Sequence, residues 1–466
     1  MSDRYDFVVI GGGSAGYAAA STASRLGLRT AVVEGAEHIG GLCILRGCMP
    51  SKTLLESAHR AESVRRAGEF GLRAEYLGPD GPKIVARKRL LVSDFATYRR
   101  QQLESGKFEL IRGRAAFLDA QTLEVTRAEG EPLRLESRAF LVATGSRISR
   151  VHVPGLDDAG CWDSDETLDA ASIPKSVIVL GGGAIGLEFA SYYAGLGVEV
   201  SVIQRNVQLL KEMDRDIADE LARALEAHGM RIFRDTAIAS TERSGSHKRV
   251  HFYQGGEKKT VEAEQIIYAL GREALTDGLQ LDQAGVALER SREVRVTATQ
   301  QSSSAHIFAA GDVCGPLQVV HIAIQQGELA ARNAARLLQG DTEPLEQMDY
   351  ALKLFAVFTQ PEVAAIGLTE REAQEQGRDV LTATYPFNDH GKSMVRGETD
   401  GFVKLIVERE SRRIVGAAAI GPEVSELIHE IAAVMHFRGT AGDLARIPHY
   451  HPTLSEIWTY PAEELA

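Results

Sequence analysis

Two cysteines that lie close together are the residues in this chain most able to do chemistry. Cys43 and Cys48 are separated by four residues, and Gly47 stands directly before the second. A zinc site favours shorter spacings and needs two further nitrogen or sulfur ligands nearby, so we expect no metal site here. A structural disulfide is unusual in a chain that looks cytosolic. We therefore interpret Cys43 and Cys48 as a redox-active pair.

The segment around this pair has helical character, which constrains how the two sulfurs can meet. In a regular helix, residues five positions apart are separated by about 7.5 Å along the axis alone. A disulfide requires Cα atoms within roughly 7 Å. The pair can therefore close only in a distorted helix, and Gly47 lowers the cost of that distortion. A bond held in such a turn is expected to be easier to reduce than a structural one. The alternative is two unpaired core thiols.

A glycine-rich loop precedes the cysteine pair and matches a dinucleotide-binding fingerprint. Gly11, Gly13 and Gly16 have the required spacing, and Ser14 lies between the last two. The flanking segments indicate a strand, a helix and a second strand, over residues 6–10, 17–26 and 30–33. The second strand ends in Glu34, which is placed to accept hydrogen bonds from ribose hydroxyls. Glycines allow close approach of a pyrophosphate, and amides at the start of the helix bind its charge.

The same unit recurs later in the chain. The second loop has its glycines at Gly181, Gly183 and Gly186, between a strand at 177–180 and a helix at 187–196, with the next strand at 199–203. Two such units predict two dinucleotides, or one dinucleotide and a decayed copy. The second unit ends in Gln204 and Arg205 instead of an acid, and Lys211 follows. An arginine there favours a 2′-phosphate, so NADP(H) is favoured over NAD(H). The alternative is that Arg205 is a solvated surface residue.

Further motifs give the chain a resemblance to a known family. They are Leu141-Val142-Ala143-Thr144-Gly145, Ala269-Leu270-Gly271-Arg272, Ala309-Ala310-Gly311-Asp312 and the run from His449 to Glu456. With the two loops and the cysteine pair, they occur in the order found in the flavin disulfide reductases, a family that includes dihydrolipoamide dehydrogenase, glutathione reductase and mercuric reductase. The resemblance extends over nearly the whole chain.

This resemblance implies an α/β fold with two Rossmann-like dinucleotide-binding domains and a C-terminal α+β dimerisation domain. The FAD-binding domain is expected to be discontinuous, at 1–150 and 272–344. The NAD(P)-binding domain is expected at 151–271 and the dimerisation domain at 345–466. Apolar segments at 402–407 and 414–420 suit strands of the last domain. The residues that the resemblance adds to the cofactor sites are Gly41, Lys52, Ala115, Thr144, Gly145, Gly271 and Asp312.

The resemblance also implies roles for the reactive residues. Cys48 would face the flavin and Cys43 would exchange with the substrate. His451 would act as the base that exchange requires, and Glu456 would orient its ring. In the family this pair comes from the other subunit, so a homodimer with a composite active site is expected. Lys52 and Glu188 would form an ion pair beside the flavin; we give His449 no catalytic role.

Composition excludes several other classes of protein. The formal net charge of the 466 residues is -12, which argues against a nucleic-acid partner. No apolar stretch is long enough to span a bilayer, and the N-terminal residues do not resemble a signal peptide. We therefore expect a cytoplasmic protein without a membrane partner. Cys161 and Cys314 are isolated in the sequence and are expected to be inert.

The motifs do not identify the disulfide that is the substrate. The first helix has Ser21 where glutathione reductases carry an arginine, and the C-terminus lacks the extra cysteine pair of mercuric reductases. Both features favour a dihydrolipoamide dehydrogenase-like enzyme, acting on a small dithiol or disulfide such as a lipoyl group on a carrier protein. Arg205 argues in the other direction, because most such enzymes use NAD. The alternatives are an NADPH-dependent reductase of another disulfide, a quinone reductase or transhydrogenase with an idle cysteine pair, and a non-catalytic FAD-binding scaffold.

Overall fold

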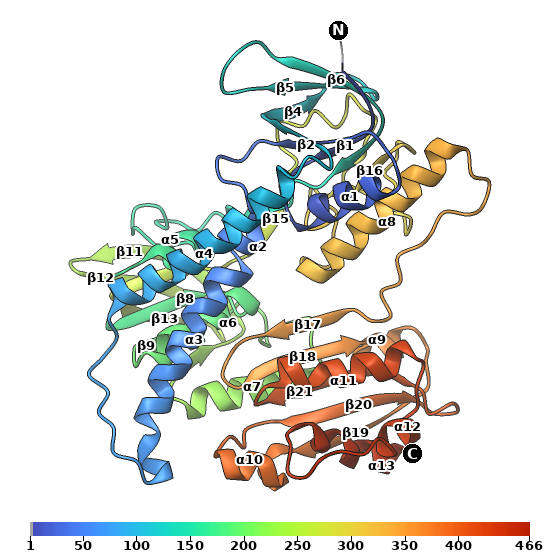
Figure 1. The fold of residues 1–466 in the computed structure, drawn as a ribbon. Helices are drawn as coiled ribbons and strands as arrows, with labels where there is room; N and C mark the ends of the chain where they lie inside the picture. Colours follow the sequence, from blue (N-terminus) through green and yellow to red (C-terminus); the bar gives the residue numbers. More distant parts are fainter. Residues whose placement is uncertain (1–2) are drawn as a thin grey trace. The chain divides into compact units, whose positions relative to one another are not determined.

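The computed structural model describes residues 3–466, which form two compact units (Figure 1). Of the described residues, the first unit consists of 3–50, Ala86–Ser149 and Gly271–Asp349. The second unit consists of Ser51–Val85, Arg150–Leu270 and Tyr350–Ala466. Each unit is assembled from segments that are distant in sequence.

The first unit is built on a mostly parallel sheet with the strand order β3-β2-β1-β6-β5-β4. Its strands are β1 (Asp3–Ile10), β2 (Thr30–Glu34), β3 (Glu109–Arg112), β4 (Arg114–Phe117), β5 (Thr122–Thr126), β6 (Leu133–Val142) and β16 (Ile307–Ala309). β16 pairs in parallel with the last residues of β6, and β4 and β5 form the antiparallel edge. The carboxyl ends of β1, β6 and β16 therefore lie side by side, where a doubly wound sheet binds its ligand.

Two helices cover one face of this sheet and pack closely on each other (Figure 1). They are α1 (Ser14–Arg25) and α8 (Val320–Gln339). The buried face of α1 is rich in alanine, and a Cβ atom on Gly327 of α8 would lie 2.3 Å from the carbonyl oxygen of Ala15. Small residues are thus required on both helices. A short two-stranded ladder joins β7 (Ser146–Ile148) to β15 (Arg272–Ala274).

Three helices connect these strands. They are α2 (Gly41–Leu45), α3 (Cys48–Arg65) and α4 (Gly81–Leu103). Most of α3 belongs to the second unit, and α4 contributes residues to both units. A short 3-10 helix, η1 (Ala67–Phe70), follows α3.

The second unit contains a parallel sheet with the order β10-β9-β8-β14. Its strands are β8 (Ser176–Leu180), β9 (Glu199–Ile203), β10 (Arg231–Phe233) and β14 (Gln265–Tyr268). The associated helices are α5 (Ser164–Asp169), α6 (Ala184–Gly195) and α7 (Arg215–Ala227), and an antiparallel sheet joins β11 (Thr236–Ser244), β12 (His247–Gln254) and β13 (Glu257–Ala263). The succession β8, loop, α6, β9 repeats the succession β1, loop, α1, β2.

The same unit holds a five-stranded antiparallel sheet with the order β17-β18-β21-β20-β19. The strands are β17 (Leu354–Val357), β18 (Glu362–Gly367), β19 (Val380–Pro386), β20 (Phe402–Glu408) and β21 (Ile414–Gly421). The remaining helices are α9 (Glu370–Glu375), η2 (Phe387–Asp389), α10 (Gly391–Arg396), α11 (Val424–His436), α12 (Ala441–Ala445), η3 (Ser455–Trp458) and α13 (Thr459–Leu465). α11 packs on β18 and β21, and α13 packs on β19 and β20 (Figure 1).

The α/β fold class predicted from the sequence is confirmed. The strands and helices expected around both glycine loops are present, with boundaries within a few residues of the prediction. The two strands expected near the C-terminus are β20 and β21. The exact division into three domains at 150, 271 and 344 stays a prediction.

Candidate functional site

The first glycine loop connects β1 to α1 in the conformation that a nucleotide phosphate requires. A Cβ atom on Gly16 would lie 1.8 Å from the carbonyl oxygen of Gly11, so only glycine fits there. Gly13 caps α1 and has no side chain that could occupy the helix amides. These amides can therefore bind an anionic group at the positive end of the helix.

Glu34 at the end of β2 is turned toward this loop and buried. Its Oε2 accepts a hydrogen bond from the amide of Gly12 at 2.8 Å, and its Oε1 accepts one from the amide of Ala36 at 2.7 Å. Each carboxylate oxygen can accept a second hydrogen bond. The carboxylate is thereby fixed beside the loop, as binding of ribose hydroxyls requires.

The motifs Leu141–Gly145 and Ala309–Asp312 meet at the carboxyl ends of β6 and β16. Ser146 donates a hydrogen bond to Oδ2 of Asp312 at 2.6 Å and accepts one from Nε of Arg272 at 2.9 Å. Thr144 donates to the carbonyl of Leu275 at 2.7 Å. Asp312 is therefore oriented by a chain of hydrogen bonds. The other residues predicted at this site, Ser14, Ala115, Gly145 and Gly271, lie at the start of α1, in β4, after β6 and before β15.

The cysteine pair lies where one helix ends and the next begins. α2 ends at Leu45, and α3 begins at Cys48. A Cβ atom on Gly47 would lie 3.1 Å from the carbonyl oxygen of Leu42 and 3.3 Å from the Cα of Cys43. The regular helix is therefore interrupted between the cysteines, which confirms the expected distortion. Both cysteines are half-buried.

Gly41 brings the start of α2 against the first glycine loop. Its φ is +71°, and a Cβ atom at this position would lie 2.7 Å from the Cα of Gly13. A side chain is excluded here by both the backbone conformation and the close approach. The segment that carries Cys43 and Cys48 is consequently held directly beside the predicted nucleotide site.

Lys52 and Glu188 form the ion pair that the resemblance implied. Nζ of Lys52 is 2.9 Å from both carboxylate oxygens of Glu188. Glu188 Oε1 also accepts a hydrogen bond from the amide of Phe358 at 3.2 Å, and Nζ of Lys52 lies 4.6 Å from the centre of the Phe358 ring. The side chain of Glu188 is 9% exposed, whereas that of Lys52 is 32% exposed. The lysine charge is therefore positioned by a buried carboxylate.

The second glycine loop repeats the geometry of the first, with an amide in place of the carboxylate. A Cβ atom on Gly186 would lie 2.3 Å from the carbonyl oxygen of Gly181. Gln204 accepts a hydrogen bond from the amide of Gly182 at 3.1 Å, so its side chain takes the place that Glu34 has in the first unit. The helix α6 is capped by Gly183 and again has free amides at its start.

Two cations follow this loop. Arg205 is exposed, and no hydrogen bond or ion pair joins it to another residue of 3–466. Lys211 is exposed and lies 3.6 Å from Glu212. Of these three side chains, only Gln204 is hydrogen-bonded to the glycine loop. Arg205 and Lys211 therefore remain able to bind a ligand phosphate.

The C-terminal histidine motif places His451 beside Glu456. Nδ1 of His451 is 3.0 Å from Oε2 of Glu456, and the carboxylate is buried while the ring is 79% exposed. The hydrogen bond fixes the ring, and its Nε2 edge faces outward. An imidazole that is oriented by a carboxylate and exposed in this way can exchange a proton with a group outside this protomer.

A buried histidine behind Glu456 was missed by the sequence interpretation. Nε2 of His390 lies 3.5 Å from Oε1 of Glu456, too poorly aligned for a hydrogen bond, and Nδ1 of His390 is 2.9 Å from the hydroxyl of Ser393. Burial lowers the pKa of His390, although the charge of Glu456 opposes this effect. No spacing rule connects His390, which directly precedes α10, to the C-terminal motif, because only folding brings it beside Glu456 in η3.

The remaining candidate residues have structural roles. His449 contacts Oε1 of Glu430 at 2.7 Å and is largely buried. Burial raises the pKa of Cys161 to about 11 and that of Cys314 to about 12. Neither thiol is a reactive thiolate near neutral pH, which agrees with the sequence interpretation.

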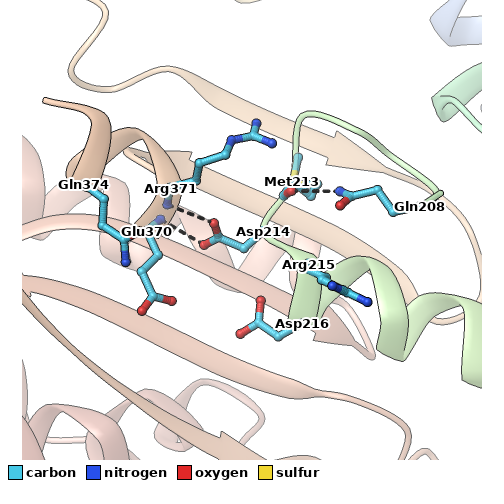
Figure 2. A pocket seen from close by; sticks show the side chains of 8 residues that line it. All are labelled: Gln208, Met213, Asp214, Arg215, Asp216, Glu370, Arg371 and Gln374. Atoms are coloured by element: carbon cyan, nitrogen blue, oxygen red, sulfur yellow. Dashed lines mark hydrogen bonds between the residues drawn. The ribbon is translucent and has the colours of Figure 1, made fainter. Parts of the chain in front are cut away.

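A separate hollow in the second unit is lined by charged side chains between α7 and α9 (Figure 2). Asp214 accepts hydrogen bonds from the amides of Glu370 and Arg371 at 3.0 and 3.3 Å. Nζ of the buried Lys404 lies 2.7–3.2 Å from the carboxylates of Asp214, Asp216 and Glu370. The hollow contains no cysteine or histidine and is explained as a structural ion-pair network.

Residues 3–466 contain neither a membrane-spanning helix nor a cluster of metal ligands. None of the helices there is both long enough and apolar enough to cross a membrane. Within the same range, no three His, Cys, Asp or Glu side chains gather in a group that could hold a metal ion.

Comparison with known proteins places these features in one family. Residues 5–327 match the pyridine nucleotide-disulphide oxidoreductases, and residues 355–462 match the dimerisation domain of the same family. The dihydrolipoyl dehydrogenase of Thermus scotoductus is 35% identical, over 99% of this chain and 97% of its own, and that of Bacillus subtilis is 34% identical, over 98% and 97%.

Solved structures show the same fold over the whole length. LpdA from Mycobacterium tuberculosis is 29% identical with a TM-score of 0.88, and the match covers 100% of both chains. The HOCl-induced flavoprotein disulfide reductase RclA from Escherichia coli, solved as a Cu(II) complex, is 27% identical with a TM-score of 0.86, also over 100% of both chains.

The chain belongs to the pyridine nucleotide-disulphide oxidoreductase family. It is an FAD-dependent disulfide oxidoreductase that uses a nicotinamide coenzyme. The residues present fit an FAD molecule, because the Gly11–Gly16 loop admits a pyrophosphate, Glu34 is fixed beside it, and Asp312 is oriented at the neighbouring strand ends.

Proposed function

We propose that this chain forms a homodimeric, NADP(H)-preferring reductase of a small disulfide, with Cys43 and Cys48 as its redox-active pair. The observation that supports this most directly is the contact between Gly41 and Gly13. It holds the dithiol segment beside the nucleotide loop, where exchange with a flavin requires it. FAD, when bound, supplies a two-electron carrier between the coenzyme and the cysteine pair.

The thiol chemistry is assigned to residues of the chain. The Cys43 thiolate attacks one sulfur of the substrate disulfide and expels the other sulfur, which takes a proton from the His451 imidazolium. The Cys48 thiolate then attacks Cys43, so that the second product thiol leaves and the protein disulfide forms. Glu456 stabilises the charge that His451 carries before this proton transfer. The outward-facing ring of His451 supports its action on the pair of a second subunit.

The proposed coenzyme preference rests on the end of β9. Gln204 is neutral, so it does not repel a 2′-phosphate as a carboxylate would. Arg205 is exposed and can offer two hydrogen bonds to that phosphate, and Lys211 adds a second positive charge.

The proposed substrate is a lipoyl group, free or on a carrier protein. This proposal is supported by relatives that are named dihydrolipoyl dehydrogenase. The division into FAD-binding, NAD(P)-binding and dimerisation domains and the cytoplasmic location likewise stay predictions.

A substrate panel tests the proposed function. Purified protein is assayed with NADPH and NADH against lipoamide, glutathione disulfide and a quinone. We expect the highest specificity constant with NADPH and a lipoyl disulfide, and loss of disulfide turnover in Cys43→Ser and Cys48→Ser. The two variants separate the roles, because only Cys48→Ser is expected to abolish long-wavelength absorbance of the reduced protein. Quinone turnover that persists in both variants without any disulfide turnover in the parent protein would contradict the proposal.

A further inference from the structure

The first unit contains a half-buried arginine with two buried nitrogens that make no hydrogen bond. Arg99 lies near the end of α4, and its Nε and Nη1 atoms are buried and make no hydrogen bond. Its guanidinium lies 4.3 Å from the centre of the Tyr17 ring. Over residues 3–466, no carboxylate forms an ion pair with it.

Burial of this charge is costly. Burial lowers the pKa of Arg99, and the groups that oppose this shift are the side chains of Tyr17, Cys43 and Tyr98. None of them is a carboxylate. A cation–π contact supplies less stabilisation than desolvation of an unpaired charge costs. Lys404, by contrast, is buried among three carboxylates.

The neighbourhood of Arg99 has further unused polar groups. The Oγ of Ser21 and the Oε1 of Gln102 are buried without hydrogen-bond partners. Ser21 lies one turn after Tyr17 on α1, and Gln102 lies one turn after Arg99 on α4, so each pair shares a helix face. Further polar atoms without partners therefore lie on α1 and α4, the two helices that the contact between Arg99 and Tyr17 joins.

This group of side chains is separate from the phosphate end of α1. The loop amides bind a pyrophosphate at Gly13 and Ser14, whereas Tyr17 and Ser21 follow about 5 and 10 Å farther along the helix axis. Gly41 at the start of α2 lies against Gly13 at the start of α1. Cys43 follows Gly41 by two residues, and Tyr17, which Arg99 contacts, follows Gly13 by one helical turn, so Cys43 and Arg99 belong to the same end of α1. The unpaired cation is thus placed to meet whatever Cys43 attacks.

We propose that Arg99 binds an anionic group of the disulfide substrate, a carboxylate, while Cys43 attacks one of its sulfurs. The planar guanidinium has two unused donors for such a group, and the Tyr17 ring supports its orientation. This inference rests on the proposed function and narrows its substrate class to disulfides that carry a negative charge.

The first test compares two disulfides that share a dithiolane ring and differ in charge, lipoate and lipoamide. Arg99→Gln should lower the ratio of their specificity constants by about 10- to 100-fold, mainly through the Michaelis constant for lipoate. Arg99→Lys should restore part of the loss. Arg100→Gln is the matched control, because it removes the same charge from the next, exposed position of α4. An unchanged ratio in Arg99→Gln overturns the inference.

The second test needs no disulfide turnover. Protein reduced with dithiothreitol is alkylated with iodoacetate, which is anionic, or with iodoacetamide, which is neutral, and modification of Cys43 is followed by peptide mass spectrometry. Both reagents react with the same thiolate, so a change in the reactivity of Cys43 alters both rates equally and leaves their ratio unchanged. Arg99→Gln should lower this ratio about tenfold, and Arg100→Gln should leave it unchanged.

The two tests separate this inference from the proposed function. If the parent protein reduces neither lipoate nor lipoamide, the proposed function fails, and the alkylation ratio still decides whether Arg99 binds anions beside Cys43. An unchanged alkylation ratio overturns the inference. Loss of bound FAD in Arg99→Gln also overturns the inference, because Arg99 would then be a residue that binds the nucleotide.

Discussion

Replacement of Glu456 by Gln tests the His451 base most specifically. The carboxylate accepts a hydrogen bond from Nδ1 of His451 at 3.0 Å and is largely buried. Gln has nearly the same shape, and its amide oxygen can accept the same hydrogen bond. The change therefore removes the negative charge that stabilises the imidazolium and leaves the ring's position largely intact.

The size of the effect follows from this contact. A hydrogen bond to a charged group is worth about 1.5–3 kcal/mol, which corresponds to roughly a 10- to 100-fold loss of disulfide turnover. Because His390 adds a second, weaker contact with the carboxylate at 3.5 Å, the variant also loses the charge that His390 faces. We expect a loss within this range and no greater.

The assay measures two activities of the same protein. NADPH oxidation with lipoamide requires thiol exchange, whereas NADPH oxidation with ferricyanide does not require His451. Glu456→Gln should slow the first reaction and spare the second. Glu430→Gln is the matched control, since Glu430 contacts His449 at 2.7 Å in another buried Glu–His pair. Equal loss of both activities, or an equal loss in the control, would refute the assignment of His451 as the base.

The remaining predictions concern the coenzyme and stability. Arg205→Ala should raise the Michaelis constant for NADPH by about 10- to 100-fold and leave that for NADH nearly unchanged; a higher specificity constant for NADH in the parent protein would contradict this prediction. Lys404→Met leaves three carboxylates without their shared cation and should lower the free energy of unfolding by about 3 kcal/mol, measured by urea denaturation; an unchanged midpoint would show that the network is dispensable. Hydrogen bonds from His228 and then Arg223 lower the pKa of Asp400 to about 2, and the pKa of His228 is raised by Asp400. Asp400 contributes to the free energy of unfolding above its unfolded pKa near 3.8, and this contribution is lost as the pH falls through about 2. His228 contributes to the free energy of unfolding below about 6.5, and this contribution is lost as the pH rises through its raised pKa. Asp400→Asn should therefore lower the melting temperature most near pH 5 and less at pH 8; an equal reduction at both values would be evidence against the pair.

Local patterns were sufficient to predict the nucleotide loops and the elements around them. Glycine spacing, an apolar strand and a following helix determine a loop conformation through short-range sterics, as Gly16 and Gly186 show. The position of Gln204 was also accessible from the sequence, because it follows Gly182 by the same 22 residues that separate Glu34 from Gly12. Its contact with the loop amide was not predicted.

Contacts between distant segments could not be predicted from spacing. His390 reaches Glu456 only because folding brings the residue before α10 beside η3, and neither residue belongs to a motif that contains the other. Arg99 was missed for a similar reason. In the sequence it is one of two adjacent arginines on a polar helix, and only folding places its guanidinium over the Tyr17 ring.

Thiol counting after reduction tests the central claim most directly. The protein is reduced anaerobically with stoichiometric NADPH, denatured, and titrated for thiols beside an untreated sample. If Cys43 and Cys48 are the redox-active pair, reduction makes both of their thiols newly titratable, and Cys43→Ser shows no such increase. Equal thiol content before and after reduction, with flavin absorbance bleached by the coenzyme, would show that the pair is idle and contradict the account.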